Sequence, residues 1–517
     1  MFQFFKKTRK QKEQVIEDTI LEWNVPLEER KIQPSLKENI AISKQLFSDM
    51  DIIRYRTITQ NKGETLQYFL IYCDGMVNTD VINNNILKPL MLTASDAGHL
   101  PDSTLLPEVI QVGAVKTIDS FRCVVDSVAS GSTVLFAEGR KEAVVLDTKQ
   151  WALRSIEEPD SEKALVGPRE GFTESLMQNL SQVVRRIHTN EFKTKMMTFG
   201  RRTKTPLCVC YIDGLVDKSI LKELMQRLNR IDIDGVLDTN YITELIRDHH
   251  FSPFRITGYT ERPDTVVGKL LEGRIAIFIE GSPMVLTLPY LFIENFQSSE
   301  DYYLSFYYTS FSRILRICAF LLTVTIPGLY IAIVAFHQEM LPLQLLMQIA
   351  LERQSVPMPA AMEAVVMLLV FDVLRETGIR MPSKIGQALS IVGALVIGQA
   401  AVEASLVASP MIIVVASTGI TSLLVPKLNA SVIIWRFILL FFATSFGFFG
   451  FTIGLSLMAI HIYNLTSFGV EQASLKGGFR FQDIKDIAFR APWPQMRERP
   501  DNLTSNITRL SGGSDDA

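Results

Sequence analysis

Hydrophobic and polar positions divide this chain into two parts. Before Ile317 the apolar runs are short and alternate with charged segments, whereas from Ile317 to Tyr463 the chain is almost wholly apolar, glycine or hydroxyl. The chain has 52 Lys and Arg and 55 Asp and Glu, but only twelve charged side chains fall within that apolar window. Because a charge at membrane depth is costly, the pattern is typical of a membrane domain. The sequence therefore predicts a multi-pass α-helical membrane protein with an N-terminal water-soluble region.

The first apolar segment predicts a membrane-spanning helix. Ile317 to Phe336 carries no charge, and as a helix it would be about 30 Å long, which matches the hydrocarbon core. Arg313 and Arg316 precede it, and no Lys or Arg follows until Arg353. The positive-inside rule therefore places its start, and the region before it, in the cytoplasm.

The later apolar segments leave the number of spans open between four and six. They are Ala360 to Leu374, Ala388 to Ala408, Met411 to Val425 and Ser431 to Tyr463. As one helix the last segment would be about 50 Å long, too long for one untilted span and short for two. Gly447, Gly450 or Gly454 could break it. A basic, cytoplasmic tail after it would require an even number of crossings.

A few polar side chains at membrane depth are the candidate pore residues: Glu363, Asp372, Gln399, Glu403 and Arg436. Gln399 and Glu403 are one turn apart and share a helix face. Acidic groups that face a water-filled path would favour cations. The alternative is that all these charges are satisfied by pairing inside a helix bundle, without a transport role.

The soluble part contains an internal repeat. Tyr72-Cys-Asp-Gly-Met-Val77 matches Tyr211-Ile-Asp-Gly-Leu-Val216, and the strand-like run that ends in Glu138-Gly139 matches the one that ends in Glu280-Gly281. In each copy β-rich runs end in an acid and a glycine, which suits a strand exit. After the Asp-Gly step a helical pattern follows in both copies, over Thr79 to Met91 and over Lys218 to Asn229. Two matches at nearly equal spacing predict two related α/β subdomains.

Composition shifts along the chain predict its domains. We expect a basic N-terminal tail over 1–30, α/β subdomains over 31–154 and 169–295 with a linker over 155–168 between them, an interfacial connector over 296–313, a transmembrane domain over 314–463 and a cytoplasmic tail over 464–517. Within the first subdomain, Ser35-Leu-Lys-Glu38 predicts a capping box that opens a helix ending near Phe47.

The stretch from Glu280 to Tyr303, which runs into the connector, mixes acids with apolar and aromatic residues. We expect this segment to lie at the membrane surface and to couple the two halves of the protein. The candidate coupling residues are Glu280, Gly281, Pro283, Glu300, Asp301 and Tyr302.

Motif and composition searches argue against several other classes. Walker A, GxGxxG, HExxH and GxSxG motifs are absent, and the six histidines are scattered. We therefore expect no catalytic residue, cofactor or metal site. A net charge of −3 argues against nucleic-acid binding. The basic start lacks the apolar core of a signal peptide, and we expect the five cysteines to be mostly buried, reduced thiols.

Eight stretches in chain order resemble the A subunit of spore germinant receptors, the GerA family of spore germination proteins. They are Val166-Gly-Pro-Arg-Glu-Gly-Phe-Thr-Glu-Ser175, Tyr211-Ile-Asp-Gly214, Thr260-Glu-Arg-Pro-Asp264, Glu280-Gly-Ser-Pro283, Phe296-Gln-Ser-Ser-Glu-Asp-Tyr-Tyr303, Arg375-Glu-Thr-Gly-Ile-Arg380, Ile391-Val-Gly-Ala-Leu-Val-Ile-Gly-Gln-Ala-Ala401 and Ile487-Ala-Phe-Arg-Ala-Pro492. They run from the linker to the tail, and together they are highly specific.

The resemblance implies a subunit of a receptor in the inner membrane of the spore that triggers germination. It implies self-association, as a pentamer, into a nutrient-gated cation channel. The implied partners are a transporter-like B subunit, taken to bind the nutrient, and a lipoprotein C subunit. SpoVAF-type paralogues without a nutrient specificity of their own belong to the same family and fit the sequence equally well.

Three other classes stay open on the residues alone. A secondary transporter or exporter predicts an inverted repeat within 314–463, and none is visible by eye. A membrane-anchored enzyme would need catalytic motifs, which are absent. A non-conducting scaffold subunit would use its membrane charges only for packing.

Overall fold

The computed structural model describes two compact units. The described residues are 30–59, 66–91, 110–150, 162, 166–381, 393, 396–473 and short pieces of the tail, namely 486, 487, 489–496, 498, 499, 503, 504, 508 and 509. Unit 1 holds described residues up to Ile246, Tyr259–Leu288, Leu503 and Thr504, whereas unit 2 holds Arg247–Gly258 and the described residues from Pro289 onward, apart from Leu503 and Thr504. Most of the predicted linker, and the tail before residue 30, lie outside the described residues. Residues 247–258 belong to unit 2, although we assigned them to the second subdomain.

Unit 1 is built from two five-stranded sheets with the same strand order. The first contains β1 (Ile53–Thr59), β2 (Leu66–Cys73), β3 (Val115–Ile118), β4 (Thr133–Ala137) and β5 (Ala143–Leu146), in the order β1-β2-β4-β5-β3. The second contains β6 (Phe192–Phe199), β7 (Thr205–Ile212), β8 (Gly258–Thr260), β9 (Ile275–Ile279) and β10 (Val285–Leu288), in the order β6-β7-β9-β10-β8. The repeat in the sequence is therefore also a repeat of topology.

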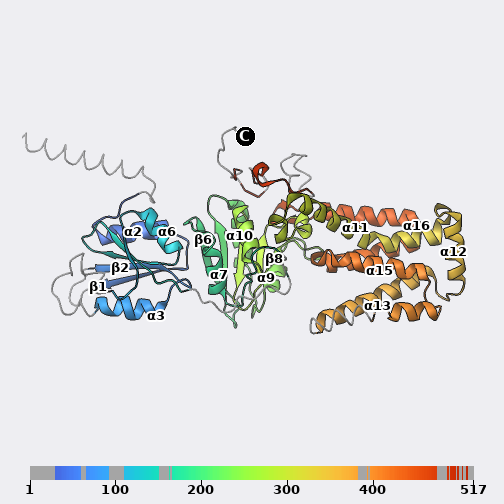
Figure 1. The fold of residues 1–517 in the computed structure, drawn as a ribbon, viewed down its shortest axis with the longest axis horizontal. Coiled ribbons are helices and arrows are strands. Elements are labelled where there is room, and N and C mark those ends of the chain that lie inside the picture. Colours follow the sequence, from blue (N-terminus) through green and yellow to red (C-terminus); the bar gives the residue numbers. More distant parts are fainter. Residues whose placement is uncertain are drawn as a thin grey trace, which may run out of the picture. The chain divides into compact units, whose positions relative to one another are not determined.

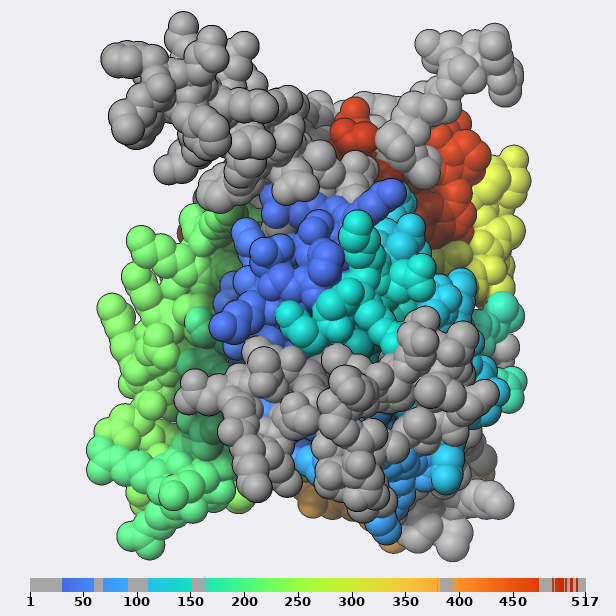
Figure 2. Space-filling view, turned by 90° about the vertical axis from the view of Figure 1, so that its left-hand side faces the viewer, coloured from blue at the N-terminus to red at the C-terminus, as the bar shows by residue number. Residues whose placement is uncertain are grey.

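One hydrophobic core joins the two sheets. It contains buried residues of α2 (Leu36–Leu46) and α6 (Phe121–Ala129) with the first sheet, and of α7 (Leu176–Val184) and α10 (Pro263–Leu271) with the second. In Figure 1, α2 and α6 cover one face of the first sheet and α3 (Thr79–Val81) lies on the other. Figure 2 shows the blue residues of α2 and the cyan residues near α6 side by side on the surface of the first subdomain.

Equivalent glutamates cap the first helix of each subdomain. The Leu36 amide donates to Glu138 Oε2 over 2.8 Å, and the Leu176 amide donates to Glu280 Oε2 over 2.8 Å. Ser35 makes no capping bond with any described residue, so the predicted capping box is wrong. A carboxylate from a distant strand end satisfies the free amide instead, and its negative charge suits a helix N-terminus.

Other helices complete both units. In unit 1, π-helical Ile82–Leu87 follows α3, and the second subdomain adds α8 (Lys218–Asn229), as predicted, and α9 (Thr239–Ile246). Unit 2 contains α11 (Phe306–Phe336), α12 (Leu343–Gln354), α13 (Ala360–Arg380), α15 (Ser409–Leu423) and α16 (Asn429–Tyr463), with residues 396–403 also helical. α11 begins inside the range 296–313 that we assigned to the connector.

Within the described residues, two helical stretches are long and apolar enough to cross a membrane, Phe306–Phe336 and Pro426–Tyr463, and Ser409–Leu423 is a shorter apolar helix. The predicted total of four to six spans includes Ala388 to Ala408, of which 388–392, 394 and 395 lie outside the described residues.

α16 is a hairpin of two helices that packs along α11 (Figure 1). Gly447 has φ 61° and ψ −138°, which breaks the helix. The rings of Trp435 and His461 lie 5.6 Å apart, whereas one straight helix would separate them by about 39 Å. The two halves are about 27 Å and 24 Å long, close to the thickness of the hydrocarbon core.

The turn of this hairpin lies beside the end of α11. A Cβ atom at Gly447 would come within 2.8 Å of Phe336 Cβ. Because φ is positive and Phe336 is so close, this position favours glycine on two independent grounds. The last apolar segment therefore reverses direction level with the C-terminal end of the first long helix.

Candidate functional site

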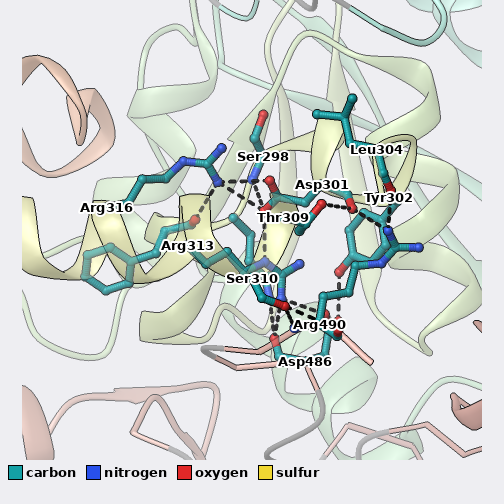
Figure 3. Close-up of polar contacts among 12 residues, drawn as sticks. Ser298, Asp301, Tyr302, Leu304, Thr309, Ser310, Arg313, Arg316, Asp486 and Arg490 are labelled. Atoms are coloured by element: carbon teal, nitrogen blue, oxygen red, sulfur yellow. Dashed lines mark hydrogen bonds and ion pairs between the residues drawn. The ribbon is translucent and has the colours of Figure 1, made fainter. Parts of the chain in front are cut away.

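Unit 2 contains a buried polar cluster where the connector, the start of α11 and the C-terminal tail meet (Figure 3). We call it the connector–tail cluster and define it as Asp301, Tyr302, Arg313, Arg316, Asp486 and Arg490. Asp301 is the third residue of a one-turn 3₁₀ helix, Ser299–Tyr302, and its carboxylate accepts from the Ser298 amide over 3.2 Å. Local capping therefore helps to fix the position of the carboxylate.

Two arginines of α11 converge on Asp301. Arg313 Nε donates to Asp301 Oδ2 over 2.9 Å, and Arg316 Nη1 lies 3.0 Å from both carboxylate oxygens. Asp301 is 1% exposed and Arg313 is fully buried. Residues three apart lie on the same face of a helix, so the spacing of the two arginines produces this convergence.

The tail supplies the second carboxylate and a third arginine. Asp486 accepts from Arg313 Nη1 over 2.7 Å and from the Tyr302 hydroxyl over 2.8 Å. Arg490 Nη1 donates to the backbone oxygens of Asp301 and Leu304, each over 2.8 Å. Burial lowers the pKa of Arg490, and the charge of Asp486 opposes that shift.

The geometry of the cluster suits a structural joint, which holds the connector, the start of α11 and the tail together, rather than a catalytic site. Arg313 and Arg316 engage both carboxylates, and Arg490 donates to backbone oxygens of the connector. Within the described part of the chain, no three His, Cys, Asp or Glu side chains are grouped so as to hold a metal ion. Removal of one partner from such a buried network leaves an uncompensated charge, so the joint is strong only while the tail stays bound.

The six candidate coupling residues are divided between the two units. Glu300, Asp301 and Tyr302 lie in unit 2, whereas Glu280, Gly281 and Pro283 lie in unit 1. Glu280 caps α7, and the Gly281 amide donates to Glu174 O over 2.8 Å. Pro283 is half-buried in the bend between β9 and β10. Glu280 and Gly281 therefore make local contacts within the second subdomain.

Glu363, among the candidate pore residues, is buried and caps a helix. Its Oε1 accepts from the Ala408 amide, which immediately precedes α15, over 2.6 Å, and the side chain is fully buried. Glu352 Oε2 accepts from the next amide, Ser409, over 3.2 Å. Two glutamates from earlier in the chain thus hold the start of α15.

Asp372 and Arg436 form an ion pair between α13 and α16. Arg436 Nη2 lies 2.5 Å from Asp372 Oδ2, and Arg375 lies 3.3 Å from the other carboxylate oxygen. Arg436 is 1% exposed. The pair neutralises charge within unit 2, in agreement with the alternative that we weighed for these residues.

Gln399 and Glu403 differ from the other candidates because both are exposed. Gln399 Nε2 donates to Glu403 Oε1 over 3.0 Å, so the predicted one-turn pair is formed. Large apolar side chains on the same helical stretch, Val396 and Ile397, are also exposed. The stretch therefore presents a polar pair within an otherwise apolar surface.

The sequence patterns did not indicate the arginine and tail members of the connector–tail cluster. We interpreted Arg313 and Arg316 only as positive charges at the border of a span, and we assigned no role to Asp486 or Arg490. The available signal was the stretch Ile487-Ala-Phe-Arg-Ala-Pro492, which contains Arg490 and follows Asp486 directly. Its contacts with the connector are more than 170 residues away along the chain.

Comparisons with known proteins place these features in a family context. The family model described as Bacillus/Clostridium GerA spore germination protein matches residues 41–502. Spore germination protein KA of Bacillus subtilis (strain 168) is 40% identical over 476 residues, which are 92% of this chain and 87% of that protein. Uncharacterized membrane protein YfkQ of the same organism is 40% identical, with 92% of each chain covered. Spore germination protein A1, also of that organism, is 31% identical, with 90% of this chain and 96% of that one covered.

One solved structure is also similar. The N-terminal domain of the A subunit of the Bacillus megaterium spore germinant receptor GerK3 is 30% identical, with a TM-score of 0.41. The match covers 51% of this chain and 98% of that one.

Proposed function

This chain belongs to the GerA family of spore germination proteins, and from that premise we propose that it is a membrane subunit of a nutrient germinant receptor. We propose further that copies of the chain assemble around a cation-conducting path that opens when the receptor binds its nutrient. The observation that carries the proposal is the exposed pair Gln399 and Glu403.

A membrane topology with six crossings is consistent with unit 2. α11, α13, the helix that includes residues 396–403, α15 and the two halves of α16 would cross in alternating directions. The approach of Gly447 to Phe336 supports this order, because both would then lie on the outer side. The Glu363 bond to Ala408 supports it too, since α13 and α15 would both start there.

The energetic cost of exposing the polar pair to lipid favours an assembly. A carboxylate in contact with acyl chains costs several kcal/mol, roughly 2.5–3.5 on insertion scales. If the face that bears Gln399 and Glu403 lined a water-filled path between copies, Glu403 would stay hydrated. A ring of such carboxylates would attract cations and repel anions. The family resemblance implies five copies.

The other candidate pore residues fit a supporting role better. Glu363 is engaged in capping α15, and Asp372 is paired with Arg436. Neither carboxylate could line a path without giving up a buried partner. We therefore assign pore lining to Glu403 with Gln399, and assign Glu363, Asp372 and Arg436 to the packing of the bundle.

The connector–tail cluster is our candidate for the coupling element. It joins the connector to the start of α11, so a displacement of the connector or the tail would act on the first membrane helix directly. The proposed partners are the transporter-like B subunit and the lipoprotein C subunit, in the inner membrane of the spore, with unit 1 in the cytoplasm.

Cation release during germination tests the pore assignment. Spores would carry Glu403→Gln, with Glu403→Asp as the charge-preserving control, at matched protein level. We expect the glutamine variant to slow monovalent cation release after nutrient addition, whereas the aspartate variant keeps most of it. Normal release from spores with Glu403→Gln, and also with Gln399→Leu, would exclude this face as a pore lining.

A non-conducting scaffold is the second candidate, favoured by the internal pairing of Asp372 with Arg436 and the capping by Glu363. It predicts that membrane charges matter only for protein level. Under this alternative, Asp372→Asn would reduce protein abundance in spores, and Glu403→Gln would change neither abundance nor cation release.

A further inference from the structure

Two residues of the C-terminal tail are packed into the second α/β subdomain. Leu503 is fully buried and Thr504 is 4% exposed, and both belong to unit 1. The Thr504 hydroxyl donates to Leu215 O over 2.5 Å. A Cβ atom at Gly273 would lie 2.8 Å from Thr504 Cβ and 2.6 Å from Leu215 O, so the glycine makes room for this contact.

The first subdomain shows what occupies the equivalent place there. Met76 corresponds to Leu215, and Gly131 corresponds to Gly273, in the two copies of the repeat. Met76 O accepts from the Gln150 amide over 3.1 Å, and the Asn78 amide donates to Thr148 O over 2.8 Å. The segment that follows β5 therefore returns over the strand exit and satisfies its carbonyl group.

The second subdomain cannot use its own equivalent segment in this way. β10 ends at Leu288, and the chain from Pro289 onward belongs to unit 2, where the Tyr290 amide donates to Ser467 Oγ over 3.1 Å. Without the tail, Leu215 O would lose its Thr504 partner and the contact surface of Leu503 would be open to water. Both changes are unfavourable.

We propose that the strand-exit surface at Leu215 and Gly273 is a docking site whose occupant is the tail segment Leu503-Thr504 of this chain. The tail replaces the segment that the first subdomain supplies from its own sequence. The occupant is identified by one fully buried leucine and one hydroxyl that donates to a backbone oxygen. The proposal does not depend on ion conduction.

Hydrogen exchange on the full-length chain in membranes tests the docking. The Leu215 and Val216 amides, which donate to Ile212 O, report on this strand exit. We expect Leu503→Asp to speed their exchange at least tenfold and leave the first sheet unchanged. Thr504→Val should speed it less, whereas Thr504→Ser, which keeps the hydroxyl, should restore protection. Thr508→Val is the matched control, because Thr508 is exposed in the same tail.

A second measurement keeps the proposal testable if Leu503→Asp lowers protein yield. A fluorescent peptide of residues 499–509 would be added to the membrane-bound chain truncated after Glu498. We expect the unmodified peptide to bind saturably. The peptide that carries Leu503→Asp should bind with an affinity at least tenfold weaker. Absence of binding to a truncated chain whose sheets remain protected, or unchanged exchange in Leu503→Asp, would overturn the docking site.

Discussion

Replacement of Asp301 by asparagine tests the connector–tail cluster most severely. Asp301→Asn keeps the shape of the side chain but removes one of the two carboxylates that pair with Arg313 and Arg316. Arg313 is fully buried and has no access to water to compensate. Loss of one partner from a buried ion pair costs about 3–5 kcal/mol. For a domain of this size that corresponds to a fall in Tm of roughly 6–20 °C.

The assay is thermal unfolding of the purified full-length chain in detergent, followed through the tryptophans of unit 2. Glu376→Gln is the matched control, because Glu376 pairs with Arg380 over 2.7 Å but the two side chains are 59% and 77% exposed. An exposed pair contributes at most about 1 kcal/mol. If Asp301→Asn and Glu376→Gln lowered Tm by the same amount, the claim that burial makes the cluster a joint would be wrong.

Three further predictions address the fold of each unit. Gly447→Ala should disrupt the α16 hairpin and lower protein abundance in membranes, at a cost of about 1–3 kcal/mol for the backbone conformation alone. Gly454→Ala is the control and should be tolerated, because its Cβ would meet Leu439 Cγ at an ordinary 3.5 Å. Equal abundance of the two variants would contradict this prediction. Glu138→Ala and Glu280→Ala should each lower the free energy of unfolding of unit 1 by about 0.5–2 kcal/mol in denaturant titration. Ser35→Ala should have almost no effect. If Ser35→Ala lowered the free energy of unfolding more than Glu138→Ala, our assignment of the cap would be wrong. Burial, and secondarily the charge of Asp74, raises the pKa of Cys73 to about 12, so little thiolate forms at this residue near pH 8. A maleimide should therefore label the folded protein at Cys123 but not at Cys73. Rapid labelling at Cys73 would show that the first sheet opens.

Periodicity and local signals predicted the elements whose cause is local. α8 begins at Lys218 and ends at Asn229 as expected, because an apolar stripe and a capping aspartate, Asp217, define it within one segment. The repeat of acid–glycine strand exits predicted the repeated topology for the same reason. Gly447, the first of three candidate glycines, is where the last apolar segment breaks.

Features that depend on distant residues could not be predicted in this way. Ser35 and Glu38 match a capping box, but Glu138, 102 residues from Leu36, supplies the cap. Glu363 and Asp372 have the sequence signature of pore residues, yet their partners lie 45 and 64 residues away. A charged residue at membrane depth needs either a polar partner or contact with water. Only the tertiary structure shows which of these two it has.

The buried residues of the C-terminal tail also could not be predicted from the sequence. The basic C-terminal segment predicts a cytoplasmic tail, and nothing in its periodicity indicates burial. Asp486 and Arg490 are held by contacts in unit 2, and Leu503 is buried in unit 1 because the second subdomain lacks a segment of its own over the strand exit. That requirement becomes visible only when the two copies of the repeat are compared in three dimensions.

The reversal potential of the receptor reconstituted with its partner subunits in a planar bilayer tests the central claim most directly. Across a tenfold gradient of potassium chloride, a ring of Glu403 carboxylates predicts nutrient-dependent current with a reversal potential close to that of potassium, and Glu403→Gln should move it toward zero while leaving the assembly intact. Absence of nutrient-dependent current from an intact complex, or a reversal potential unchanged by Glu403→Gln, would contradict the account.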